Sequence, residues 1–192
     1  MSGRIHNLGP SGHLDDFARR NLPPPELWPD LMLDRPEFQY PDYLNVAVEL
    51  TDRNVEKGFG DHVALIGNGR QRTYKELADW SNRLAHALVE NYGVKPGNRI
   101  LIRSGNNPAL VAAWLAATKA GAVVVNTMPM LRAGELAKIV DKAEVALALT
   151  DSRIADELGR TSLPERILRA WLAGVAHHAD NGRVASKRNV MA

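Results

Sequence analysis

The sequence predicts an α/β fold built on a doubly wound, mainly parallel sheet. Short apolar runs bounded by Gly and Pro alternate along residues 63–150 with longer segments of helical periodicity. Several of these runs are apolar throughout, which is typical of parallel strands covered by helices on both faces. Right-handed crossovers between such strands give a doubly wound sheet.

The first predicted strand is Val63–Ile66, followed by a hairpin-like turn at residues 67–70. Thr73 and Glu76 have the spacing of a capping box, in which Thr caps the helix and Glu reaches back to the cap. One face of the helix that follows is apolar apart from one serine: Leu77, Ser81, Leu84, Ala85, Leu88 and Tyr92. Gly93–Pro96 ends this helix, because Gly adopts the left-handed conformation and Pro prevents the helix from resuming.

The central part of the predicted sheet comes next. Ile100–Ile102 is a short apolar run and is expected to be a buried strand. Asn107–Pro108 marks a helix start, since Asn caps and Pro suits the first helical position. Residues 109–120 are apolar nearly all round, which predicts a helix buried on most faces. Gly121 fits the left-handed position at its end, and Val123–Val125 is the next strand.

The last two predicted elements of the α/β unit are a helix and a strand. Leu136, Ile139 and Val140 give a weaker apolar stripe on a helix that runs to about residue 142. Val145–Leu149 is a further apolar strand, and Thr150 and Asp151 close it.

The chain therefore divides into three predicted parts. Residues 1–42 are Pro-rich and are expected to run irregularly over the surface of the sheet domain. Residues 43–158 form the α/β unit. Residues 159–192 form a basic tail, in which residues 163–171 are expected to make a short helix. Three apolar side chains are expected to anchor the Pro-rich segment 1–42 on the sheet domain: Trp28, Leu31 and Leu33.

Several segments resemble the AMP-forming acyl-CoA synthetases and their adenylating relatives. Thr73–Leu77 resembles the first core motif of this superfamily, and Lys119–Ala122 leading to Asn126–Pro129 resembles the second. Thr127–Leu136 is most similar to 2-aminobenzoate and benzoate CoA ligases, and the lead-in Pro41–Asn45 resembles the same branch. The resemblance implies the N-terminal subdomain of an enzyme that uses ATP, Mg²⁺ and CoA to convert a carboxylic acid first into its adenylate and then into its thioester.

The sequence does not contain the other motifs of that family. It has no Ser/Thr/Gly-rich phosphate loop closing on Lys and no Tyr-Gly-x-Thr-Glu segment, and we find no match to the C-terminal lid with its catalytic Lys. We therefore assign no catalytic, cofactor-binding or metal-binding residue by resemblance. The expectation is a truncated aryl-acid–CoA ligase that is inactive alone. The alternatives are a subunit of a split ligase and a non-enzymatic module that binds protein or nucleic acid.

Three residues are candidates for ligand contact. Asn126, Thr127 and Met128 are expected in the loop after a strand end, where α/β sheets usually bind ligands. The alternative is a turn that redirects the chain toward the next helix. Adjacent His177 and His178 point to different sides of a helix or strand and lack further ligands, so we expect no metal site.

The tail after residue 160 is more basic than the rest of the chain. It is either a basic arm for nucleic acid or an acidic membrane surface, or a stretch unrelated to the family, such as a frameshift would produce. The cations are scattered, so we expect no nucleic-acid partner. The absence of Cys fits the cytoplasm, and no signal peptide or membrane span is expected. The expected partners are the missing remainder of the ligase or another copy of the chain, because an apolar face would otherwise be exposed.

Overall fold

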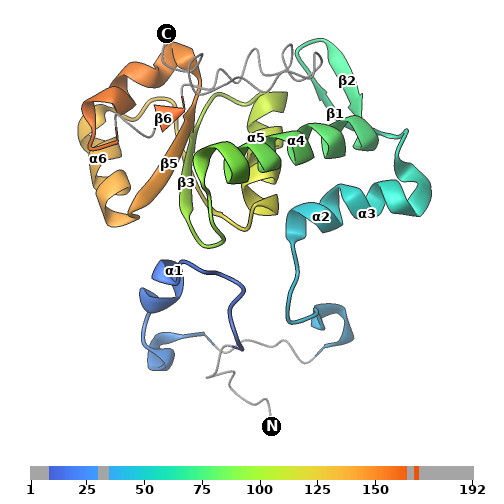
Figure 1. Cartoon of the computed structure of the whole chain (residues 1–192), viewed down its shortest axis with the longest axis horizontal. Helices are drawn as coiled ribbons and strands as arrows, with labels where there is room; N and C mark the ends of the chain where they lie inside the picture. The colour runs from blue at the N-terminus through green and yellow to red at the C-terminus, as the bar shows by residue number, and fades with distance from the viewer. Residues whose placement is uncertain (1–8, 30–34, 164–166, 169–192) are drawn as a thin grey trace.

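The computed structural model describes residues 9–29, 35–163 and 167–168, and Figure 1 shows their arrangement. A four-stranded parallel sheet has the order β4-β3-β5-β6. Its strands are β3 (Arg99–Arg103), β4 (Val123–Thr127), β5 (Val145–Thr150) and β6 (Ile167–Leu168). Helix α5 (Pro108–Lys119) joins β3 to β4, and helix α6 (Ala133–Lys142) joins β4 to β5.

The two faces of this sheet carry different helices. Helices α4 (Tyr74–Tyr92) and α5 pack with Ile100, Ile102, Leu147 and Leu149 on one face. Helix α6 and the helical segment η4 (Ser152–Arg160) pack with Leu101, Val145 and Ala148 on the other. The chain moves from β3 outward to β4 and then back across β3 to β5, so its two crossover helices lie on opposite faces. The predicted doubly wound parallel sheet is confirmed.

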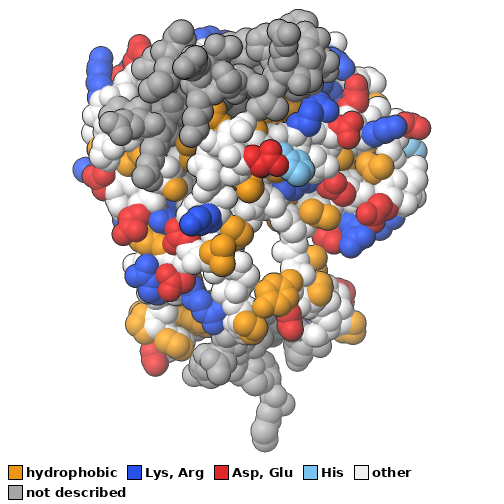
Figure 2. All heavy atoms as spheres, in the orientation of Figure 1, with side chains coloured by type: hydrophobic (Ala, Val, Ile, Leu, Met, Phe, Trp, Pro, Cys, Tyr) orange, Lys and Arg blue, Asp and Glu red, His pale blue; other side chains and the backbone are white. Residues whose placement is uncertain are grey.

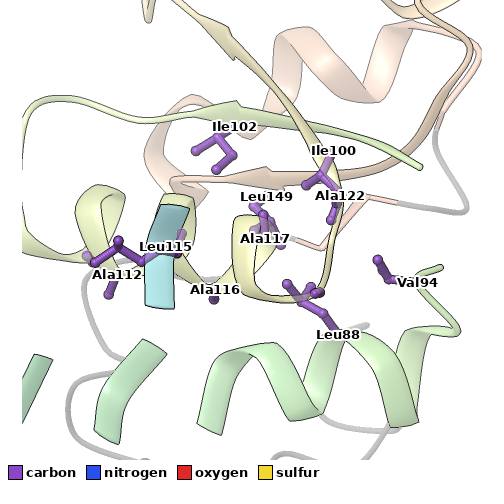
Figure 3. Packing of buried hydrophobic residues seen from close by; sticks show 14 of the residues in the cluster. Leu88, Val94, Ile100, Ile102, Ala112, Leu115, Ala116, Ala117, Ala122 and Leu149 are labelled. Carbon is purple, nitrogen blue, oxygen red and sulfur yellow. The ribbon is translucent and has the colours of Figure 1, made fainter. Parts of the chain in front are cut away.

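The face covered by α5 is packed tightly. Ala112, Ala116 and Ala117 are fully buried on this helix, and Figure 3 shows them between the strand residues Ile102 and Leu149 and the helix residue Leu88. Alanine lets the α5 backbone approach both the sheet and α4, because it adds little volume between them. The prediction of a helix buried on most faces is confirmed.

The predicted helix boundaries are set by the residues that the sequence indicated. The Glu76 amide donates to Thr73 Oγ1 at 3.2 Å and the Thr73 amide donates to Glu76 Oε2 at 2.9 Å, which completes the capping box. Asn107 Oδ1 accepts from the Leu110 amide at 3.0 Å. Gly93 ends α4 at a φ of 65° in the left-handed region.

We expect Thr73→Ala to destabilise the fold by about 1 kcal/mol, because the Glu76 amide then loses its partner at the helix end. Thr73→Ser is the matched control, since its hydroxyl keeps the cap. Urea unfolding followed by circular dichroism measures both. Equal stability of the Ala and Ser variants would show that the cap contributes nothing to this fold.

The prediction for residues 63–66 needs a correction. Strand β1 (Val63–Gly67) lies outside the parallel sheet and pairs antiparallel with β2 (Arg70–Thr73), a strand that the sequence analysis did not predict. The cause is the turn between them: Asn68 and Gly69 have φ values of 53° and 73°. Two consecutive left-handed residues are typical of the tight hairpin turn that joins neighbouring antiparallel strands.

Within the N-terminal segment predicted to be irregular, residues 9–29 and 35–42 contain short helical turns: α1 (Phe17–Arg20), η1 (Pro25–Leu27) and η2 (Pro36–Phe38). Helices α2 (Val46–Leu50), α3 (Asp52–Asn54) and η3 (Val55–Phe59) lie between β1 and this N-terminal segment. In Figure 1 its first part lies below the sheet and α2. Trp28 is half-buried and its indole N–H donates to the Pro23 carbonyl at 2.7 Å. The other two predicted anchors, Leu31 and Leu33, lie outside the described residues.

The helix predicted for residues 163–171 is wrong where the structure describes it. Ile167 and Leu168 form β6, paired with Ala148 and Leu149 of β5. An open strand edge offers unpaired N–H and C=O groups, so pairing there competes with a short helix. The division at residues 42/43 and 158/159 stays a prediction. Among the described residues, no helix is long and apolar enough to cross a membrane.

Candidate functional site

The carboxyl ends of β3, β4 and β5 meet at one edge of the sheet. Because the chain runs from β3 to β4 and then back past β3 to β5, the strand order reverses between β3 and β5. Open α/β sheets bind ligands at such a switch point, outside the carboxyl ends of the strands. This edge, which we call the carboxyl edge, is formed by residues 103–107, 126–132 and 150–154.

The three sequence-predicted candidates lie at this edge, but two of them are in a strand. Asn126 and Thr127 are the last residues of β4, paired with Ile102 and Arg103 of β3. The predicted strand ends at Val125 because the apolar run stops there, whereas backbone pairing does not require apolar side chains. Asn126 is exposed, and Thr127 Oγ1 donates to the Ile102 carbonyl at 3.4 Å.

Met128 follows β4 in a turn. Its side chain is 62% exposed, and its carbonyl accepts from the Leu131 amide at 3.2 Å. Met130, on the same turn, is 78% exposed. The turn therefore redirects the chain into α6, and it also holds two methionine side chains toward solvent.

Arg103 is the most deeply buried charge at the carboxyl edge. Only 1% of the residue is exposed. Its guanidinium donates to three backbone carbonyls: Pro129 at 2.6 Å, Leu131 at 2.9 Å, and Ile154. Burial lowers the pKa of Arg103, although arginine remains charged throughout the physiological range. The side chain therefore fixes the turn after β4 and the segment after β5 relative to the end of β3.

The acidic group at the carboxyl edge is also engaged within the chain. Asp151 is 3% exposed, and its two oxygens accept from Arg153 Nε at 3.0 Å and Arg153 Nη2 at 2.6 Å. The hydrogen bonds from Arg153 hold the pKa of Asp151 below its usual value, against the opposing effect of burial. The Asp151 amide donates to the Arg103 carbonyl at 3.0 Å. Asp151 is thus an ionised cap of η4 rather than a free base.

Helix α5 begins at this edge with a small polar group of residues. Ser104 is buried, and its Oγ accepts from Asn107 Nδ2 at 2.9 Å. Asn107 in turn caps α5, as described above. The polar atoms of both side chains are therefore used to start the helix.

These residues do not fit ATP and Mg²⁺. The charged side chains of the carboxyl edge are Arg103, Arg132, Asp151 and Arg153. Arg103 binds backbone carbonyls, Asp151 and Arg153 bind each other, and Arg132 Nη1 donates to Glu157 Oε1 at 3.3 Å. In the part of the chain that the structure describes, no three His, Asp or Glu residues lie together so that they could hold a metal ion. Figure 2 shows Lys and Arg interspersed with Asp and Glu on the visible face, with no large area of a single sign.

Histidines contribute nothing to this edge in the described residues. His86 is exposed on α4 beside Glu90, with 3.6 Å between Nδ1 and the nearest carboxylate oxygen, as expected for a surface position. His177 and His178 lie outside the described residues.

Sequence reasoning missed Arg103 and Asp151. The available signal was the pattern Arg-Ile-Leu-Ile-Arg at 99–103, in which both arginines share a strand face with Leu101. Only the apolar run Ile100–Ile102 was used to predict this strand, although alternation places the two arginines on the same face as Leu101.

Comparisons with known proteins agree with this architecture. The family described as AMP-binding enzyme matches residues 52–186. A medium/long-chain-fatty-acid–CoA/3-oxocholest-4-en-26-oate–CoA ligase of Mycolicibacterium smegmatis is 33% identical over 122 residues, which cover 64% of this chain and 21% of that protein. A 3-hydroxybenzoate–CoA ligase of Aromatoleum is 30% identical over 112 residues, covering 58% of this chain and 21% of that protein. The chain thus spans about a fifth of the length of these relatives.

A solved structure shows the same fold. An anthranilate CoA ligase in complex with anthranoyl-AMP superposes with a TM-score of 0.60 at 21% identity, over 67% of this chain and 25% of that one. The α/β architecture with its parallel sheet matches the N-terminal subdomain of adenylate-forming enzymes. The match over residues 52–186 covers most of the sequence, and the chain therefore belongs to the AMP-binding enzyme family.

Proposed function

We propose that this chain is the N-terminal part of an aryl-acid–CoA ligase and is inactive alone. In the complete reaction, ATP and an aromatic carboxylate form an acyl-adenylate and pyrophosphate, and CoA then displaces AMP. The observation that supports inactivity is the state of the carboxyl edge. Both terminal nitrogens of the buried Arg103 and both oxygens of the buried Asp151 make internal hydrogen bonds, and Arg103 Nε is buried, so neither group is presented to a triphosphate or a substrate acid.

The aryl-acid branch is supported by the turn after β4. Residues 127–136 resemble the corresponding segment of 2-aminobenzoate and benzoate CoA ligases. Two of the relatives reported above carry the names of benzoate-type ligases, one for 3-hydroxybenzoate and one for anthranilate. The relative from Mycolicibacterium smegmatis is instead named for fatty acids and a steroid acid, so the relatives differ in the class of acid they use. The aryl-acid class is therefore part of what we propose.

In this proposal the partner is the remainder of the ligase, encoded separately or in the same gene. That remainder supplies the phosphate-binding loop, the acid pocket and the catalytic Lys, and this chain supplies the rigid sheet on which the carboxyl edge is built. Self-association of the isolated chain, through a surface that the remainder would cover, stays a prediction.

We expect no ATP–pyrophosphate exchange by the purified chain with benzoate or 2-aminobenzoate, and no CoA thioester on addition of CoA. A full-length aryl-acid–CoA ligase assayed in the same buffer is the positive control. A second arm co-expresses the chain with the C-terminal four-fifths of such a ligase, and we expect exchange activity to appear.

The two arms separate the parts of the proposal. Thioester formation by the chain alone would refute its inactivity. Failure of the co-expressed pair, although both pieces are soluble and folded, would argue against a ligase part that can be completed in trans.

A further inference from the structure

A short N-terminal segment crosses the amino-end edge of the sheet, opposite the carboxyl edge. We call residues 13–17 the strap. The amides of Leu14 and Asp15 both donate to the Pro96 carbonyl at 3.0 Å, across about eighty residues of sequence. The strap therefore docks on the loop that leads into the central strand β3.

One carboxylate makes the strongest contacts of the strap. Asp15 Oδ2 accepts from Arg99 Nη1 at 2.5 Å and from Asn98 Nδ2 at 2.9 Å. The Phe17 ring lies over the same guanidinium, with 4.2 Å between the ring centroid and Arg99 Cζ. Gly97 lets the strap approach closely, since a Cβ there would collide with the Asp15 carbonyl and lie 2.9 Å from His13 Cβ.

The receiving site is also held by hydrogen bonds within the protein body. Arg99 Nε donates to the Ala143 carbonyl at 2.8 Å, Nη2 to the Glu144 carbonyl at 2.9 Å and Nη1 to the Gly97 carbonyl at 3.0 Å. The Gly97 amide donates to the Gly121 carbonyl at 2.8 Å. Three carbonyls from the protein body therefore orient the guanidinium that the Asp15 carboxylate binds.

The strap has no share in the hydrophobic core. None of residues 9–29 is buried, and Leu14 is 76% exposed. Two hydrogen bonds that follow the strap are local: Arg20 Nε to Asp16 Oδ1 at 2.7 Å and Asn21 Nδ2 to the Phe17 carbonyl at 2.9 Å. Among the described contacts, residues 13–17 are therefore attached to the body by an ion pair, a stacked ring and a few hydrogen bonds, without buried apolar side chains.

We propose that the strap is a detachable element that opens from a preformed site at Pro96–Arg99 while the rest of the fold stays intact. Segments with few buried apolar contacts open with a lower free energy than the core, in separate cooperative units. Asp15 is the residue that keeps the strap closed, because a hydrogen bond to a charged group is stronger than a neutral one. This inference concerns the edge opposite the proposed ligand site and does not rest on the proposed function.

The test is native-state hydrogen exchange by NMR on the full chain at increasing, sub-denaturing urea. We expect the Leu14 and Asp15 amides to exchange faster than those of Ile100–Ile102 and with little dependence on urea, because opening the strap exposes little surface. In Asp15→Ala the strap amide of Leu14 should exchange at least about tenfold faster. Asp16→Ala is the matched control, since Asp16 is exposed and pairs only locally with Arg20, and it should change nothing.

Two results would overturn the proposal. One is exchange of the strap amides together with the core, with the same protection and the same urea dependence. The other is loss of cooperative unfolding in Asp15→Ala, because the strap would then be part of the core. Phe17→Ala gives a second, milder variant, and its strap amides should also exchange faster while β3 keeps its signals.

Discussion

Arg103→Leu is expected to destabilise the protein by about 3 kcal/mol or more. The substitution removes the charged donor for the carbonyls of Pro129, Leu131 and Ile154. Each hydrogen bond to a charged group contributes about 1.5–3 kcal/mol, and partial access of water to these carbonyls keeps the sum near the lower end. Leucine cannot replace these bonds, although it is about the right size for the space. Urea unfolding measured by both fluorescence and circular dichroism gives the free energy of unfolding.

Two further variants are compared with Arg103→Leu. Arg103→Lys keeps the charge at the same position, and Arg160→Leu is the matched control at an exposed arginine. A lysine ammonium is a point donor that cannot span three carbonyls in the plane of a guanidinium, so we expect it to recover only part of the loss. Arg160 is exposed, with 71% of its side chain accessible, and its replacement should change stability by less than about 0.5 kcal/mol. Wild-type stability in Arg103→Leu would show that water or relaxation satisfies the three carbonyls.

The second large effect is expected at the contact between α3 and α5. Lys119 has a side chain only 5% exposed, and its Nζ lies 2.5 Å from Asp52 Oδ2 and 2.7 Å from Asn82 Oδ1. Asp52→Ala leaves this buried ammonium without its counter-charge, which costs about 3 kcal/mol. The double variant Asp52→Ala/Lys119→Met should be more stable than Asp52→Ala alone, because the methionine removes the orphaned charge and keeps the packing.

The pH dependence of stability should reveal the same pair. Burial acts to raise the pKa of Asp52, but the hydrogen bonds from Lys119, Asn82 and Thr51 lower it below its ordinary value overall. The folded state then binds this proton more weakly than the unfolded chain. The stabilisation is therefore complete above the unfolded pKa of about 3.9 and is lost as the pH falls through the folded pKa.

Asp79→Ala on the exposed face of α4 is the control for this series. Its stability should follow that of the wild type at every pH, while Asp52→Ala should lose part of the acid dependence. If the wild type and Asp52→Ala differ by the same amount at pH 7 and at pH 2.5, the ionised carboxylate does not contribute to stability.

Local signals in the sequence predicted the elements of the α/β unit well. Capping by Thr73 and Asn107 and the left-handed glycines at 93 and 121 act within a few residues, so sequence spacing alone reveals them. The choice of strand partner is different. The pattern at 63–66 indicates a strand correctly, and the hairpin-like turn predicted at residues 67–70 is confirmed. The second strand of that hairpin, β2, reads Arg-Gln-Arg-Thr and has no apolar run to mark it, so the partner of β1 was missed.

The candidate site was predicted less completely because its contacts are long-range. The carbonyls bound by Arg103 come from two loops that are 26 and 51 residues away in the sequence. Carbonyls are present at every residue, so nothing in the sequence marks these three as partners. The position of the site at the strand ends could be predicted from the topology, whereas the neutralisation of its charges by internal partners required the structure.

The length of β3 has a consequence for insertions and deletions. Arg99 and Arg103 stand at the two ends of one strand face, separated by Leu101, and each holds a different pair of loops. Adding or deleting one residue between them would turn one guanidinium to the α5 side, because successive strand residues alternate between faces. Related chains that vary in length here are therefore expected to gain or lose residues in twos.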